Sequence, residues 1–437
     1  MYRRQAVAWP GQNSQTGYRS RPAPQGAPPT AQAGDNTVAD DHDIRSIGQR
    51  IHDIRRREGI SRADLAAVAD RSTDWLKSVE LGRRQLDRIG PLMAIADRLG
   101  VDLAELIGVA PRDDRSPRTG YDAVPQIRRS LLRHQLGQPT GHPRPLADLR
   151  LDAHTAHRHR QAARFGDLGA LLPGLIDDAS TAAAAHDGDE QQQTHGLLSA
   201  VLCDTAMLVK RLGQIDLATV SARQAVDAAV AAGDPLLEIA AMWTQAEVCV
   251  SAGARVEGLG IVRAGLDRLD TLLSDDDMPA WSLWGTMHLV AAVQAAQWSD
   301  RATVEDHIRE ATAAAERTGD RNDHGTCFGP ANAALMELSS RLELGDGRAA
   351  LEATQGVDLS ALPTERRARH LIDVGRAHAQ ARDDAASMRS LLEADRLAPE
   401  YVHSHAMVRD MVVTARRRDL LTSREPVHRM ARRIGVS

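Results

Sequence analysis

Apolar residues recur at helical spacing through most of the chain, and short polar breaks separate them. The stretch SRADLAAVADRSTDWLKSVELGRR, residues 61–84, holds two apolar stripes: Leu65, Ala66 and Ala69, then Leu76 and Val79. Ser61 and Ser72 stand where N-caps are expected, and Gly82 stands where a helix would end. Asp70 tolerates the positive φ of a tight turn. The pattern predicts two short helices bent sharply against each other, a helix-turn-helix.

Three further apolar-periodic segments surround this unit, so that five helices are expected between residues 47 and 108. Their stripes are Ile47, Ile51 and Ile54, then Ile89, Met93, Ala96 and Leu99, then Leu103, Leu106 and Ile107. The whole stretch from IGQRIHDIRRREG to LGVDLAELIG resembles the DNA-binding domain of phage-repressor (Xre/Cro) type transcriptional regulators. Ala66 matches the small residue that the family places at its close helix crossing, and Glu80 and Gly82 match its E-x-G ending. The turn departs from the family, because Asp70-Arg71 stands where Gly-Val is usual.

The resemblance implies a set of DNA-binding residues. In the family, the second helix of the unit enters the major groove, and its outward side chains read base edges. Carried over, the base-reading candidates are Ser72, Thr73, Asp74, Lys77 and Ser78, and the phosphate-contact candidates are Arg62, Arg71, Arg83 and Arg84. Arg71, Arg83 and Arg84 also fit an ordinary solvated surface, and the helix as a whole is the firmer prediction.

Composition favours helices throughout. The 437 residues are 42% hydrophobic but only 3% aromatic, which suits closely packed, alanine-rich helices better than sheets. We therefore expect an all-α protein. The resemblance implies a five-helix repressor-like domain at its start, and the hairpin pattern given below resembles a tetratricopeptide-like α-solenoid. The expected divisions are a disordered tail (1–42), a helix-turn-helix head (43–110), a basic Pro/Arg-rich connector (111–148) and a helical-repeat body (149–437).

Charge differs among these segments. Residues 1–43, 44–110, 111–160 and 161–437 carry net charges of 0, +2, +5 and −12, which add to the total of −5. A positive head and connector with an acidic body fit DNA binding, because phosphate attracts the former and repels the latter. Acidic solvated helices that merely follow a basic linker would produce the same asymmetry.

The body reads as a degenerate array of helical hairpins. In HLIDVGRAHAQARDDAASMRSLLEADRLAP, six residues occupy the small, aromatic, small, large, small and proline positions of a tetratricopeptide repeat, in that order: Gly375, His378, Ser387, Leu391, Ala394 and Pro399. Looser hairpins are expected at residues 197–232, 236–272, 281–318 and 331–353. The body also resembles the C-terminal half of an actinobacterial class of such regulators, a likeness that names no ligand.

Other chemistry has little support in the sequence. Cys203, Cys249 and Cys327 are widely spaced, so neither a zinc site nor a disulfide framework is indicated. His154, His157 and His159 lack a Cys or carboxylate to complete a metal site and fit a basic, solvated helix start better. The chain contains no nucleotide-binding or metalloprotease motif, so we expect no cofactor and no enzyme activity. With no secretory or membrane-spanning segment, a cytoplasmic protein without a membrane partner is expected.

The sequence leaves three functions open. The first is a homodimeric transcriptional regulator on an inverted-repeat operator in double-stranded DNA, whose body dimerises and is a candidate for sensing a small molecule or peptide. Trp284 and Asn332 are the candidate ligand contacts, although their helical spacing favours core filling between hairpins over ligand binding. The second is an adaptor that recruits a protein partner, with the head as a DNA or protein anchor. The third, an enzyme, has no supporting motif.

Overall fold

The computed structural model describes residues 45–107, 120–418 and 424–436. These ranges form twenty-one α-helices and two 3₁₀ helices and contain no strand, which confirms the all-α prediction. The described residues all belong to one compact unit of the chain. The tail predicted to be disordered, residues 1–42, lies outside the described residues, as does the first part of the connector.

Five helices form the head, as the apolar pattern predicts. They are α1 (Ile47–Arg57), α2 (Arg62–Val68), α3 (Thr73–Glu80), α4 (Ile89–Leu99) and α5 (Leu103–Ile107). The hydroxyls of Ser61 and Ser72 accept backbone N–H groups three residues on and so cap α2 and α3. Asp70 makes the turn between these helices at φ 51°, and Gly82 follows α3 at φ 68°. Both predicted turn residues therefore adopt the left-handed conformation.

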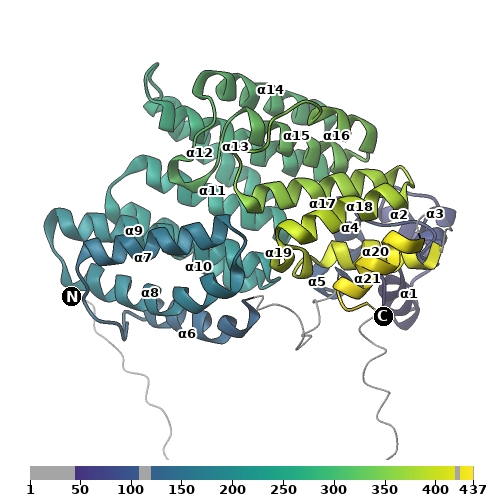
Figure 1. The fold of residues 1–437 in the computed structure, drawn as a ribbon, viewed down its shortest axis with the longest axis horizontal. Coiled ribbons are helices and arrows are strands. Elements are labelled where there is room, and N and C mark those ends of the chain that lie inside the picture. Colours follow the sequence, from purple (N-terminus) through teal and green to yellow (C-terminus); the bar gives the residue numbers. More distant parts are fainter. Residues whose placement is uncertain (1–44, 108–119, 419–423, 437) are drawn as a thin grey trace, which may run out of the picture. The chain divides into compact units, whose positions relative to one another are not determined.

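Helical hairpins follow the head, and Figure 1 shows them in teal, green and yellow. Their first members, with the connector, are η1 (Tyr121–Ala123), α6 (Val124–Gln135), α7 (Leu146–Gln161), α8 (Phe165–Ala185), α9 (Gly188–Arg211), α10 (Ile215–Ala232), α11 (Pro235–Ala252) and α12 (Arg255–Leu272). The later members are α13 (Met278–Gln297), α14 (Arg301–Thr318), η2 (Asp323–Gly325), α15 (Pro330–Leu344), α16 (Gly347–Ala353), α17 (Thr364–Gln380), α18 (Asp384–Leu397), α19 (Pro399–His403), α20 (Ala406–Arg418) and α21 (Arg424–Arg433). The region after the head is thus built from repeated helical hairpins.

Small residues allow the hairpin helices to cross closely. A Cβ atom on Gly375 of α17 would lie 3.3 Å from the carbonyl oxygen of Ser387 on α18. This is the close approach expected from the repeat-like spacing of these two residues. Leu391, one turn beyond Ser387, is fully buried against the same crossing.

The helix of the connector packs into the body. Val124, Ile127 and Leu131 of α6 belong to the same apolar cluster as α8 and α9. The hydroxyl of Ser130 also donates to Asp177 of α8 over 3.0 Å. Residues 124–135 therefore contribute to the core of the body.

Two carboxylates of the body cap helices of the head. The N–H of Ile47, at the start of α1, donates to Asp410 of α20 over 2.8 Å. The N–H of Ile89, at the start of α4, donates to Glu343 of α15 over 2.7 Å. Met407 of α20 also joins the apolar core of the head, and Figure 1 shows the head in purple beside α20. These contacts place the head firmly against the C-terminal helices.

None of the helices in the described ranges combines the length and apolar character needed to cross a membrane.

Candidate nucleic-acid interface

The third helix presents a polar face outward. Leu76 and Val79 of α3 are buried in the head, so Thr73, Asp74 and Lys77 are exposed on the opposite side. The side-chain cap from Ser72 begins the helix immediately before these residues. A two-turn helix with this face exposed has the geometry needed to place side chains in a DNA major groove.

The other predicted contact residues around α3 fall into two groups. Four are exposed: Arg71, Ser72, Arg83 and Arg84. Ser78 is half-buried, and its hydroxyl donates to the carbonyl oxygen of Asp74 over 2.8 Å. The exposed residues flank α3 at both ends, so the structure brings them together with the outward face of the helix.

Arg62 belongs to a cluster centred on Glu80. The buried Glu80 carboxylate accepts from Arg55 Nε at 2.6 Å and Arg62 Nε at 2.7 Å, and His52 Nδ1 lies 3.1 Å away. Burial alone would raise the pKa of Glu80, but the hydrogen bonds from Arg55, Arg62 and His52 lower it below its usual range. The cluster ties α1, α2 and α3 together. Because the Arg62 side chain remains 36% exposed, it retains surface for a phosphate contact.

Sequence reasoning missed the groups of the body that support this interface. Asp410 and Glu343 lie 363 and 254 residues from the head N–H groups that they accept. Arg417 of α20 packs against the turn after α3, where a Cβ atom on Gly82 would lie 2.8 Å from the Arg417 Cδ. No local pattern marks these residues, because each looks like an ordinary polar position on a helix.

Trp284 and Asn332 lie inside the body. Trp284 is half-buried between two apolar clusters, and its ring centroid lies 5.0 Å from that of His288. Asn332 is 4% exposed, and within the described residues its Oδ1 atom has no hydrogen-bond partner. Neither residue lines the cavities described below. Their ligand-binding role stays a prediction.

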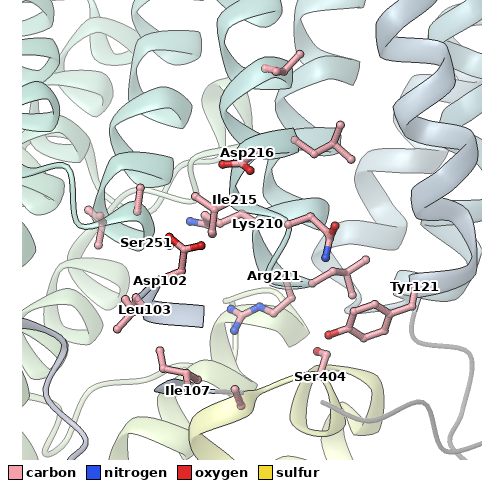
Figure 2. Close-up of a pocket in the computed structure, with 18 of the residues that line it drawn as sticks. Asp102, Leu103, Ile107, Tyr121, Lys210, Arg211, Ile215, Asp216, Ser251 and Ser404 are labelled. Atoms are coloured by element: carbon pink, nitrogen blue, oxygen red, sulfur yellow. The ribbon is translucent and has the colours of Figure 1, made fainter. Parts of the chain in front are cut away.

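The largest cavity that we describe lies between the head and the body and has a volume of about 1000 Å³. Figure 2 shows Asp102 and Leu103 of the head on one side and Lys210 and Arg211 of α9 on another, with Tyr121 and Ser404 completing the wall. The three lysine and arginine side chains of the wall are already paired: Lys210 donates to Glu247 over 2.8 Å, Arg211 donates to the Tyr401 hydroxyl, and Arg128 donates to Gln214 over 3.4 Å. The unpaired lining is mostly apolar, so the space suits a largely apolar molecule.

A second cavity, of about 540 Å³, opens beside α7, α9 and α11. Its polar wall is an ion cluster, in which Arg160 Nε donates to Asp204 over 2.5 Å and His157 Nδ1 lies 3.2 Å from the same carboxylate. Burial raises the pKa of Asp204, but Arg160 and His157 lower it below the usual range. His157, one of the histidines considered as a metal ligand, thus contacts a carboxylate. No group of three or more His, Cys, Asp or Glu side chains in the described ranges is arranged to hold a metal ion.

The head matches a known protein family. Residues 46–106 match the family model described as a helix-turn-helix domain. The match includes α1 to α4 and all but the last residue of α5. No curated protein matches the chain. The head is therefore a helix-turn-helix domain, of the kind that DNA-binding regulators use, joined to a helical repeat-like body.

Proposed function

We propose that the protein is a sequence-specific transcriptional regulator that binds double-stranded DNA through α3. The observation that carries this proposal is the exposed polar face of α3, formed by Thr73, Asp74 and Lys77, inside a matched helix-turn-helix domain. The exposed arginines 71, 83 and 84 at the two ends of α3 add the positive charge that phosphate contacts require.

Each of the three outward side chains has a chemical preference among bases. Lys77 can donate to N7 and O6 of guanine, Asp74 can accept from N4 of cytosine, and Thr73 can contact a thymine methyl. We propose that these contacts select the operator. Arg62, Arg71, Arg83 and Arg84 position the head on the DNA backbone without choosing a sequence.

The test begins by selecting bound DNA sequences from a random pool with the purified full-length protein. On the selected site, Lys77→Ala should cost about 1–3 kcal/mol per half-site and relax the preference at one base pair. Arg98→Ala is the matched control, because it removes one exposed positive charge from α4, away from the outward face of α3. If both variants lose the same affinity without a change in base preference, α3 does not read the sequence.

A single helix-turn-helix head buries only about 600–1,000 Å² against DNA. We therefore propose that two copies of the chain act together as a homodimer on an inverted repeat.

We further propose that the cavity of Figure 2 binds an effector, a small molecule or short peptide with a mainly apolar surface. Its support is that residues of the head and of the body line the same 1000 Å³ space. A molecule held there would contact both parts and so favour one arrangement of the head over others.

The proposed effector can be tested through the effect that effector and operator DNA must have on each other's affinity. An effector that changes operator affinity by some factor must have its own affinity changed by the same factor when operator DNA is present, commonly by about 1–3 kcal/mol. Compounds found by thermal shift of the full-length protein would be titrated with and without the selected operator. Equal affinities in the two titrations would contradict sensing through this cavity and favour recruitment of a protein partner by the body.

A further inference from the structure

A small polar cavity beside α3 is lined by five arginines. We call it the arginine pocket; its volume is about 280 Å³. Arg71, Arg84 and Arg88 come from the head, whereas Arg382 and Arg418 come from the body. The pocket therefore gathers positive charge from segments about 300 residues apart in the chain.

Carboxylates nearby do not balance this charge. Asp87 is the acidic residue of the lining, and its carboxylate accepts from Gln380 over 3.0 Å. Arg418 donates to Asp384, which lies outside the lining, over 2.6 Å. Asp87 and Asp384, together with Glu343, which acts on Arg88, thus set three carboxylates against five guanidinium groups.

The remaining guanidinium groups have neutral partners or none. Arg88 donates to the carbonyl oxygen of Glu343 and to the hydroxyl of Ser299, and Arg71 donates to a carbonyl oxygen of its own turn. Among the described residues, the guanidinium groups of Arg84 and Arg382 form neither a hydrogen bond nor a close ion pair, although the charge of Arg382 acts on Asp384. Burial and the positive charge of Arg71 lower the pKa of Arg88, although the carboxylates of Glu343 and Asp87 oppose them. The positive charges of the arginine pocket are therefore only partly balanced by nearby carboxylates.

Two buried donors also lack acceptors. Gln85 Nε2 and Arg418 Nε both belong to lining residues, and neither has a hydrogen-bond partner among the described residues. Buried donors without an acceptor are uncommon and costly in folded proteins. A bound anion would supply the missing acceptor oxygens and offset the excess positive charge. The lining also holds one unpaired acceptor, Gln380 Oε1, which a protonated or hydroxyl-bearing ligand would satisfy.

We propose that the arginine pocket binds a phosphate group, held by Arg84 and Gln85 of the head and by Arg382 and Arg418 of the body. Planar guanidinium groups match phosphate oxygens in paired hydrogen bonds, and phosphate carries enough charge to balance several of them. The volume far exceeds the ~10–15 Å³ that a single water needs, so part of an ester group also fits. Because head and body share the site, a bound phosphate holds the head in place against the body.

The phosphate has two sources: the backbone of bound DNA or a small phosphorylated molecule. The DNA source rests on the proposed function, since α3 would bring a backbone phosphate to Arg71 and Arg84. The small-molecule source does not depend on DNA. Two separate measurements on the full-length protein distinguish them.

The first measurement is calorimetric titration with inorganic phosphate and with adenosine monophosphate in a phosphate-free chloride buffer. Arg382→Ala and Arg84→Ala should each weaken binding about tenfold or more, because each removes charge-assisted hydrogen bonds. Arg389→Ala is the matched control, since Arg389 is an exposed arginine on α18 that does not line the pocket. Binding that responds in this way supports the site whether or not the protein binds DNA.

The second measurement is the salt dependence of duplex DNA binding. If a backbone phosphate occupies the pocket, Arg382→Ala should lower the slope of log affinity against log salt by about one unit relative to Arg389→Ala. An unchanged slope together with phosphate binding assigns the pocket to a small molecule. The proposal is overturned if the wild-type protein binds neither probe at millimolar concentration and the DNA slopes of the two variants agree. Failure of the proposed function alone would appear as phosphate binding without any DNA binding.

Discussion

Two buried carboxyl groups of this protein, Glu80 and Asp410, have pKa values shifted in opposite directions. Glu80 is buried among three partners on its own domain, and their hydrogen bonds hold its pKa below the usual range despite burial. Asp410 is buried at the join of body and head, and there burial raises its pKa to about 6. The N–H of Ile47 and the charges of Arg50 and Arg417 offset only part of that cost, and Asp87 adds to it. The surroundings of Glu80 therefore stabilise its charged form, whereas the surroundings of Asp410 favour its protonated form.

Asp410 should make stability fall as pH rises from about 4 to 6. The folded protein keeps the proton up to about pH 6, whereas the unfolded chain loses it near 3.8, so each step up through this window disfavours folding. Asp410→Asn retains an oxygen for the Ile47 N–H but has no proton to lose. The free energy of unfolding of the variant minus that of wild type should therefore rise by about 2 kcal/mol between pH 4 and pH 7.

Urea unfolding of both proteins at several pH values measures this difference. Subtracting the wild-type free energy of unfolding from that of the variant removes the pH dependence that comes from all groups common to both proteins. A difference that stays constant from pH 4 to pH 7 would contradict the protonated state assigned to Asp410.

Two glycines in helices of the body differ in how much space surrounds them. Gly285 of α13 faces Phe328, and a Cβ atom there would lie 1.9 Å from the Cζ atom of that buried ring. Gly260 of α12 is exposed, and a Cβ atom there would meet no atom within 4 Å. The same residue type is therefore required in one helix and unfavourable in the other.

Gly285→Ala should destabilise the protein by about 1–3 kcal/mol, because Phe328 must move and helix propensity offsets only part of the clash. Gly260→Ala should stabilise it by about 0.5–1 kcal/mol, since alanine loses less backbone entropy in a helix. Thermal unfolding of both variants checks the pair. Effects of the same sign would show that the close packing of α13 against Phe328 is wrong.

Contacts between head and body determine how the DNA-binding face is held. The body caps α1 and α4 through Asp410 and Glu343, and Arg417 packs at the turn after α3. These contacts hold the head against its own body. In a homodimer, the distance between two heads would then follow from how the two bodies associate.

A fixed distance between heads predicts a fixed spacing between half-sites. Selected operators should be inverted repeats whose half-sites lie about one helical turn of DNA, or a multiple of it, apart. Inserting about five base pairs between the half-sites should abolish tight binding, and inserting about ten should restore part of it. Mobility-shift titration of these operators measures the effect. Tight binding of one copy to a single unrepeated half-site would contradict the dimer.

The sequence alone determined the features that depend on neighbouring residues. Apolar spacing, the caps Ser61 and Ser72 and the turn residue Asp70 predicted the helices of the head, because these signals act within a few residues. The same reasoning located the hairpins of the body and predicted the crossing at Gly375. It also assigned the outward face of α3, since burying Leu76 and Val79 leaves Thr73, Asp74 and Lys77 exposed.

Which polar side chains meet depends on how distant helices pack in the folded protein. Nothing near Asp410 or Glu343 in the sequence indicates that they cap head helices, and nothing near Arg382 and Arg418 indicates that they join Arg84 in one pocket. A helical pattern states which face of a helix is buried but not which distant helix covers it. The pKa of a buried carboxylate and the charge of a pocket depend on those distant partners, so both had to come from the fold.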